Sequence, residues 1–190
     1  QNKDRISRLN TIALALNTSF SLTHLDATVS DGLRALFDMD CCVVYRKSLS
    51  DSTFKATYMS DDMGETIHLD YLTMCFPVHE LSLDIKESVF YMAYSGCPHV
   101  DEDRIRDLCL CYDASSVVVL QLCNHSECLG IVLGFYKHKK VGFSASNTLL
   151  FDTFLQLSAA SLQNAVNYQL LRSEKNHNES ILEHMVAGVI

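Results

Sequence analysis

Apolar and polar positions repeat with two different periods along this chain, and the two periods separate expected helices from expected strands. Between residues 4 and 17 the apolar side chains recur every three or four positions, as an amphipathic helix requires: Ile6, Leu9, Ile12, Ala13 and Leu16. A second helix is predicted from near Thr23 to Phe37. Gly32 lies inside it and weakens it by about 1 kcal/mol relative to alanine.

Shorter apolar runs bounded by polar turns are typical of strands. Such runs occupy residues 41–46, 53–59 and 88–94, and two more form a hairpin at 115–122 and 129–136. Short turns between neighbouring strands imply an antiparallel sheet, and the terminal helices can cover one of its faces. The predicted fold class is therefore α+β.

The last predicted helix, from residue 148 to 171, carries two apolar stripes where a helix packed on a single sheet needs one. The first consists of Leu150, Phe154, Leu157 and Ala165, and the second of Phe151, Leu155, Leu162 and Val166. The second stripe predicts another apolar neighbour, either the first helix or a partner chain. We expect a homodimer whose interface contains Ile6, Leu9, Phe151, Leu155, Leu162 and Val166.

The apolar spacing continues beyond residue 171 as a heptad seam weakened by polar residues: Leu171, Glu174, Asn178, Ile181 and Met185. A weak seam is easily shifted between two packings, which suits a signalling connector. We therefore divide the chain into residues 1–171, a domain with flanking helices, and residues 172–190, a connecting helix and the start of another domain. Both ends have the look of cut ends within a larger polypeptide.

The composition limits the classes of function. The chain has 190 residues, 48% apolar and 20% charged, with a net charge of −8 and a pI near 5.4. This acidity argues against nonspecific binding to nucleic acid or to an anionic membrane surface. Without a run of about 20 apolar residues or a signal-peptide pattern, a cytoplasmic location with mostly reduced cysteines is expected.

The hairpin, Leu129-Gly130 at the start of its second strand, Phe143-Ser144 and the run 162–165 resemble a GAF domain over roughly residues 6 to 171. GAF domains are small-molecule sensory modules of signalling proteins. The resemblance implies an antiparallel sheet of about six strands, with the terminal helices on one face and a ligand pocket on the other. Residues 180–190 are similar to the start of a PAS domain, and such tandems precede histidine kinases of two-component systems, cyclic-dinucleotide enzymes or transcription activators.

Pocket residues are predicted among the aromatic, sulfur and histidine side chains of the middle of the chain, a composition that suits an apolar pocket with polar handles. They are Tyr58, Met74, Phe76, His79, Tyr91, Cys97, His99 and Tyr112. Cys97-Pro98-His99 is also a candidate for haem ligation through a thiolate or an imidazole. No Cys-His dipeptide of the bilin-binding relatives occurs, and the ligand stays unidentified at this point.

Cys123 and Cys128 flank the hairpin turn and are candidates for a redox-switched disulfide. No completed metal motif and no catalytic motif is present. The leading hypothesis is a non-enzymatic sensor that binds a small molecule or senses redox state and relays the signal through a dimeric helix. The alternatives are a thiol enzyme of the free methionine sulfoxide reductase type, which shares the GAF fold, and a dimerisation spacer without ligand.

Overall fold

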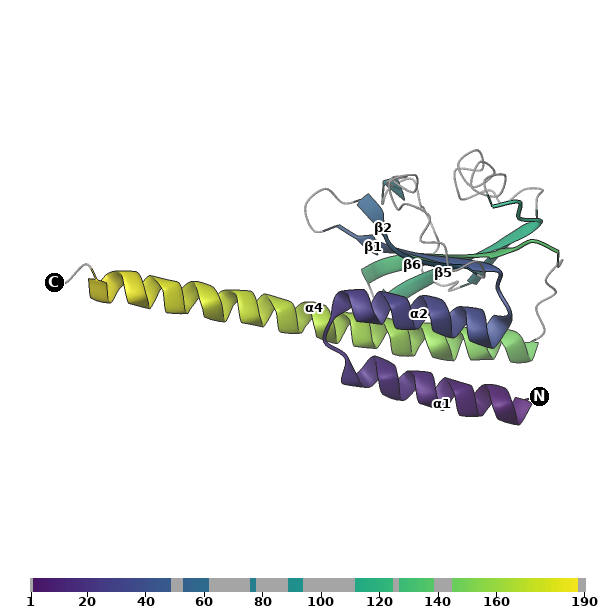
Figure 1. The fold of residues 1–190 in the computed structure, drawn as a ribbon, viewed down its shortest axis with the longest axis horizontal. Helices are drawn as coiled ribbons and strands as arrows, with labels where there is room; N and C mark the ends of the chain where they lie inside the picture. Colours follow the sequence, from purple (N-terminus) through teal and green to yellow (C-terminus); the bar gives the residue numbers. More distant parts are fainter. Residues whose placement is uncertain are drawn as a thin grey trace.

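The computed structural model describes residues 2–48, 53–61, 76–77, 89–93, 112–124, 127–138 and 145–187. In these residues a layer of helices lies against one face of an antiparallel sheet, and the last helix continues far beyond the sheet (Figure 1). The α+β class and the antiparallel sheet predicted from the sequence are confirmed. No helix within the described ranges has the length and apolar character needed to cross a membrane.

The helices are α1 (Asn2–Thr18), α2 (Leu22–Phe37) and α4 (Ala145–Ala187). The strands are β1 (Cys41–Lys47), β2 (Thr53–Asp61), β3 (Phe76–Pro77), β4 (Val89–Ala93), β5 (Ser116–Asn124) and β6 (Glu127–Tyr136). They pair in the order β3-β2-β1-β6-β5-β4, with every pairing antiparallel. The helices and hairpin expected from periodicity are present, and α2 begins at Leu22, after Ser21, whose side chain makes no capping hydrogen bond.

Successive side chains of the central strands point to opposite faces of the sheet, and both faces are apolar. On the helix side, Val44 of β1, Leu120 of β5 and Val132 of β6 share one core with the buried faces of the helices. Helices α2 and α4 pack on the strands, while α1 packs on α2 and α4 as an outer layer (Figure 1). Strands buried on both faces read as continuous apolar runs, which explains their weak alternation in the sequence.

Gly32 permits the close packing of α2 against α4. A Cβ atom at this position would lie 3.0 Å from the ring of Phe154 and 3.1 Å from Ile12. Nearby, the rings of Phe37 and Phe151 are stacked with centroids 3.5 Å apart. The helix-weakening glycine noted in the sequence is thus the residue that lets three helices meet at one point.

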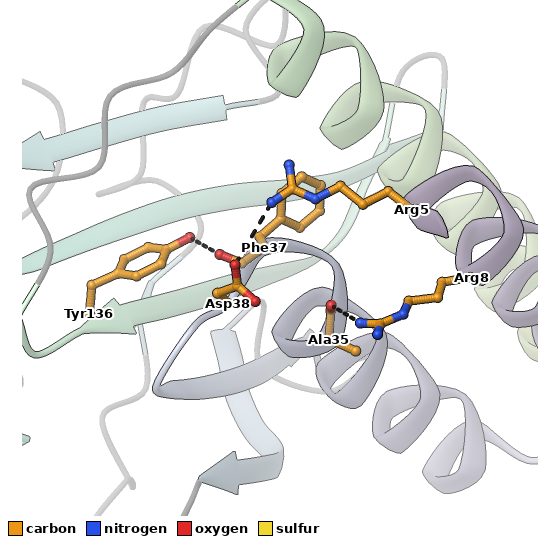
Figure 2. Close-up of polar contacts among 6 residues, drawn as sticks. All are labelled: Arg5, Arg8, Ala35, Phe37, Asp38 and Tyr136. Carbon is orange, nitrogen blue, oxygen red and sulfur yellow. Dashed lines mark hydrogen bonds and ion pairs between the residues drawn. The ribbon is translucent and has the colours of Figure 1, made fainter. Parts of the chain in front are cut away.

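The C-terminal end of α2 is held by side chains from two other elements (Figure 2). The last carbonyls of a helix lack partners within the helix. Arg8 of α1 donates to the Ala35 carbonyl at 3.2 Å, and the Tyr136 hydroxyl of β6 donates to the Phe37 carbonyl at 3.3 Å. Asp38 follows with a left-handed backbone, φ 53°, and its carboxylate lies 3.8 Å from Arg5. These contacts fix where the chain turns from helix into β1.

A polar seam joins the buried face of α2 to the sheet. The Ser30 hydroxyl donates to the Cys42 carbonyl at 3.0 Å and lies 2.7 Å from the Ser60 hydroxyl. One turn earlier, the fully buried Asp26 lies 2.8 Å from Nε of Arg46. Burial raises the pKa of Asp26 to about 6, and the nearby Arg46 guanidinium offsets only part of that effect.

We expect Asp26 to make the fold less stable as the pH rises. The pKa of Asp26 is about 6 in the folded state, above the unfolded value of about 3.9. Its contribution to the free energy of unfolding is therefore fully present below about pH 4 and lost by about pH 6. This difference corresponds to as much as about 3 kcal/mol of unfolding free energy. Urea unfolding of Asp26→Asn should lack this decline between pH 4 and pH 7, and the variant should match or exceed the native chain at pH 7.

Asp31→Asn, an exposed change on the same helix, is the control and should keep the native pH dependence. An Asp26→Asn variant whose stability falls with pH as steeply as that of the native chain would contradict the assignment.

Candidate ligand-binding face of the sheet

The face of the sheet that points away from the helices carries a second apolar core. Its residues are each at most 6% exposed: Cys41, Val43, Tyr45, Phe54, Ala114, Val117, Val119, Ile131, Leu133 and Phe135. They come from β1, β2, β5 and β6 and the approach to β5. An apolar surface of this kind is typical of the floor of a ligand pocket and equally of a plain core, so the polar groups on it decide its chemistry.

Tyr112 brings a hydroxyl group to this face. Its ring lies against Phe135, with centroids 4.9 Å apart, and its hydroxyl donates to Sδ of Met59 at 3.6 Å. Ala56 and Cys128 join Tyr112 and Met59 as the partly buried residues at the margin of the core. These four side chains are more exposed than the ten residues of the core itself.

Two further polar side chains point to the same face. Directly opposite residues of an antiparallel pair share a face, so Asp61 lies beside Cys41 and Gln121 beside Ile131. Oδ1 of Asp61 and Nε2 of Gln121 are buried, and neither has a hydrogen-bond partner among the described residues. A buried polar atom without a partner costs about 1–3 kcal/mol, so both atoms mark positions where a polar partner is needed.

Two other polar groups of this face, on Tyr45 and Cys41, are neutral. Burial, followed by the proximity of Tyr112 and Cys41, raises the pKa of Tyr45 far above its usual range. Burial also raises the pKa of the Cys41 thiol. The face therefore offers the carboxylate of Asp61, the amide of Gln121 and the phenol groups of Tyr45 and Tyr112, which suits a largely apolar ligand with a few hydrogen-bonding groups.

The structure separates the predicted pocket residues. Tyr112 lies on this face as expected, whereas Tyr58 pairs with Val44 and packs against the helix-side core, so its prediction as a pocket residue is corrected. Phe76 and Tyr91 belong to β3 and β4 of the sheet, where only the backbone is described. Met74, His79, Cys97 and His99 lie outside the described residues, and haem ligation at the last two stays a prediction.

The predicted dimer interface is divided in a similar way. Phe151, Leu155 and Leu162 are at most 2% exposed and Leu9 is 9% exposed, all within the core of the chain itself. These side chains are already covered by the chain's own helices and sheet, which corrects their placement at an interface. Ile6 is 55% exposed and Val166 is partly buried, so both stay available for a partner.

Sequence reasoning missed Asp61 and Gln121. Gln121 is a single polar residue inside the apolar run 117–122, which is a signal for a specific partner in a strand buried on both faces. Asp61 gave no such signal, because it opens a polar stretch that reads as a turn. The bulge between Val44 and Tyr45, which sets the register of β2, was also not visible in the sequence.

Comparisons with known proteins agree with this architecture. No family model matches the chain, and no curated protein matches it. Among 263 matching chains of solved structures is the crystal structure of the chromophore-binding domain of an unusual bacteriophytochrome, RpBphP3 from R. palustris. It superposes with a TM-score of 0.69 at 10% sequence identity, over 88% of this chain and 63% of that one.

This likeness shows a shared fold at very low sequence identity. The present chain spans less than two thirds of the length of the bacteriophytochrome structure. The class that the fold defines is an α+β domain consistent with the GAF-like arrangement expected from the sequence.

We predict that Gln121→Leu leaves the ligand-free chain at least as stable as the native one, and up to about 1–3 kcal/mol more stable. The substitution keeps most of the side-chain volume and removes a buried amide nitrogen that has no partner in the described part of the chain. Urea unfolding measures the change, with the exposed Gln156→Leu as control. A loss of more than about 1 kcal/mol would show that the amide is satisfied within the folded chain.

Proposed function

We propose that this chain is a sensory module of the GAF type, which binds a small molecule on the face of the sheet that points away from the helices. The observation that carries the proposal is the pair of buried polar atoms, on Asp61 and Gln121, set in an otherwise apolar face. The structurally similar bacteriophytochrome domain binds a chromophore, as its description states, and this supports a ligand-binding role for the shared fold.

The chemistry of the face defines the class of ligand. Its apolar floor favours a flat or branched hydrophobic body, and Tyr112, Gln121 and Asp61 favour hydrogen-bond donors and acceptors at the edges of that body. No Cys-His dipeptide occurs in the sequence, so covalent attachment of a bilin in the manner of those relatives is not part of the proposal.

Helix α4 is the proposed output. One side of the helix is buried in the core as far as Ala165, whereas every described side chain from Asn167 onward is exposed. A helix of about 20 residues that projects alone into water is marginally stable. The projecting part also carries Leu170, Leu171 and Ile181, each at least 43% exposed, which favours a partner helix.

The proposed partner is a second copy of the chain. Ile6 and Leu14 of α1 and Phe20, just after α1, are exposed apolar side chains of the outer helical layer. The ring of Phe20 is tilted against that of Tyr168 of α4, at a centroid distance of 5.0 Å. The C-terminal end of α1 lies beside the region where α4 leaves the sheet (Figure 1). A bound ligand that favours one arrangement of the sheet is then relayed by a small shift between paired α4 helices to a downstream domain, within the cytoplasm.

The ligand is tested on protein purified from its native host. Native mass spectra should show an added mass that denaturation releases, and the absorption spectrum distinguishes a pigment from a colourless metabolite. Gln121→Leu should retain at least tenfold less of the released molecule than the native chain, whereas Gln156→Leu should retain a native amount. Full retention by Gln121→Leu would contradict the assignment of Gln121 to the binding site. The absence of any added mass in every preparation would contradict the proposal that the chain binds a ligand.

Leu171→Asp should separate the dimer without unfolding the domain, because Leu171 is 65% exposed and lies beyond the core. Leu162→Asp should instead unfold the domain, since Leu162 is 1% exposed and a buried unpaired charge costs several kcal/mol. Sedimentation measures the oligomeric state and circular dichroism measures folding. A Leu171→Asp variant that sediments like the native dimer would contradict the proposed interface.

A further inference from the structure

Cys123 of β5 and Cys128 of β6 are direct partners across the hairpin, in the register Cys123↔Cys128. Opposite residues of an antiparallel pair have Cα atoms about 4.5–5.5 Å apart, within the range of about 4.4–6.8 Å that a disulfide spans. Both thiols are free in the structure. They meet this requirement without any movement of the strands.

A β-bulge creates this pairing. Leu122 pairs with Gly130 and Cys123 with Cys128, so Leu129 is the extra residue of β6 and packs into the helix-side core. Strict alternation from Ile131 would turn Cys128 toward the helices. The bulge reverses that direction, and Cys128 instead lies on the face away from the helices, with Ile131. Cys123 lies on the same face as Gln121, because its thiol donates to Oε1 of Gln121 at 3.2 Å.

The two thiols differ in environment in a way that suits two different chemical roles. The contact with the Cys128 thiol lowers the pKa of Cys123, whereas the contact with Cys123 and burial raise the pKa of Cys128. The Cys128 thiol donates to the Gly130 carbonyl at 3.3 Å. The Lys47 ammonium, which lies 2.8 Å from Oε1 of Glu127, offsets a small part of the rise in the pKa of Cys128. Both thiols are partly exposed, so a small oxidant can reach them.

The adjacent pair Cys41 and Cys42 provides the contrast. Both are buried, and burial raises the pKa of Cys42 to about 12 and that of Cys41 well above its usual range. Alternation places them on opposite faces of β1, where Cys42 belongs to the helix-side core and Cys41 to the other. Cys41 and Cys42 are therefore protonated, inaccessible and directed apart. The partial exposure and direct pairing of Cys123 and Cys128 are thus not shared by these other two cysteines.

We propose that Cys123 and Cys128 form a peroxide-reactive dithiol, in which Cys123 is the attacking thiolate and Cys128 the resolving thiol. The sulfur of Cys123 attacks one oxygen of a hydroperoxide, the O–O bond breaks, and an alcohol or water leaves with a proton, so that Cys123 becomes a sulfenic acid. The sulfur of Cys128 then attacks the sulfur of Cys123. The S–S bond forms, the S–O bond breaks, and water leaves with the Cys128 proton. The dithiol loses two electrons, and the hydroperoxide gains them.

This inference stands apart from the proposed ligand, because a chain that binds no small molecule still contains the paired thiols. The consequence for the fold is local. A disulfide at this pair locks the end of the β5–β6 hairpin, which is the end of the sheet from which α4 projects (Figure 1).

The full chain offers a convenient test, because Glu127 lies between the two cysteines. The chain is treated with hydrogen peroxide, free thiols are alkylated, and the endoproteinase Glu-C, which cuts after glutamate, separates the residues. The fragment 128–174 then contains Cys128 as its only cysteine. We expect it to be linked to the fragment that carries Cys123, and to be released by a reducing agent. Cys41→Ser, which changes a buried thiol, should give the same linked fragments.

Two variants assign the roles. Cys123→Ser should abolish the linked fragments and leave Cys128 available for alkylation. Cys128→Ser should instead accumulate a sulfenic acid at Cys123, which dimedone traps, at a rate within about threefold of that for native disulfide formation, because attack precedes resolution. Linked fragments that persist in Cys123→Ser, a sulfenic acid that appears at Cys128 first, or oxidation without any linkage would each overturn the proposal.

Discussion

The fold depends on strands that are buried on both faces. Strands β1, β5 and β6 present aliphatic and aromatic side chains to either side, so the sheet must be covered twice to remove that surface from water. Each fully buried aliphatic or aromatic side chain stabilises the fold by about 1.5–3 kcal/mol. One cover is the pair of helices α2 and α4, and the opposite face is where we place ligand binding. A change in what occupies that face therefore acts on the strands that also support α4.

The helical cover is held by specific contacts. Gly32 admits the ring of Phe154, Phe37 stacks on Phe151, and the end of α2 is tied to α1 and β6 through carbonyl hydrogen bonds. In the proposed relay, a shift of the sheet would reach α4 through these contacts. The exposed second half of α4 has no comparable support within the described chain, which makes it the part whose packing a partner can set.

Buried polar groups give the two faces different properties. On the helix side, Asp26 and Arg46 form an ion pair that couples α2 to β1 and depends on pH. On the other face, Asp61 and Gln121 present atoms that lack partners in the described chain, and the bulge at Leu129 brings two thiols together. The ion pair on the helix side holds the domain together. The groups on the other face suit binding of a ligand or reaction with an oxidant.

The sequence by itself determined the elements and their class, because apolar periodicity at Ile6 to Leu16 or along the hairpin depends only on neighbouring residues. Its selection of Tyr112 and of the hairpin cysteines as site residues stays a prediction. Only the tertiary structure decided the faces. Tyr58 lies toward the helices because the register pairs it with Val44, and Leu162 lies inside the protomer because α4 packs on both sheet and helix. A one-residue bulge moves the following side chains to the opposite face of the sheet. Its position depends on how two strands pair, and the spacing of residues along one chain does not encode that pairing.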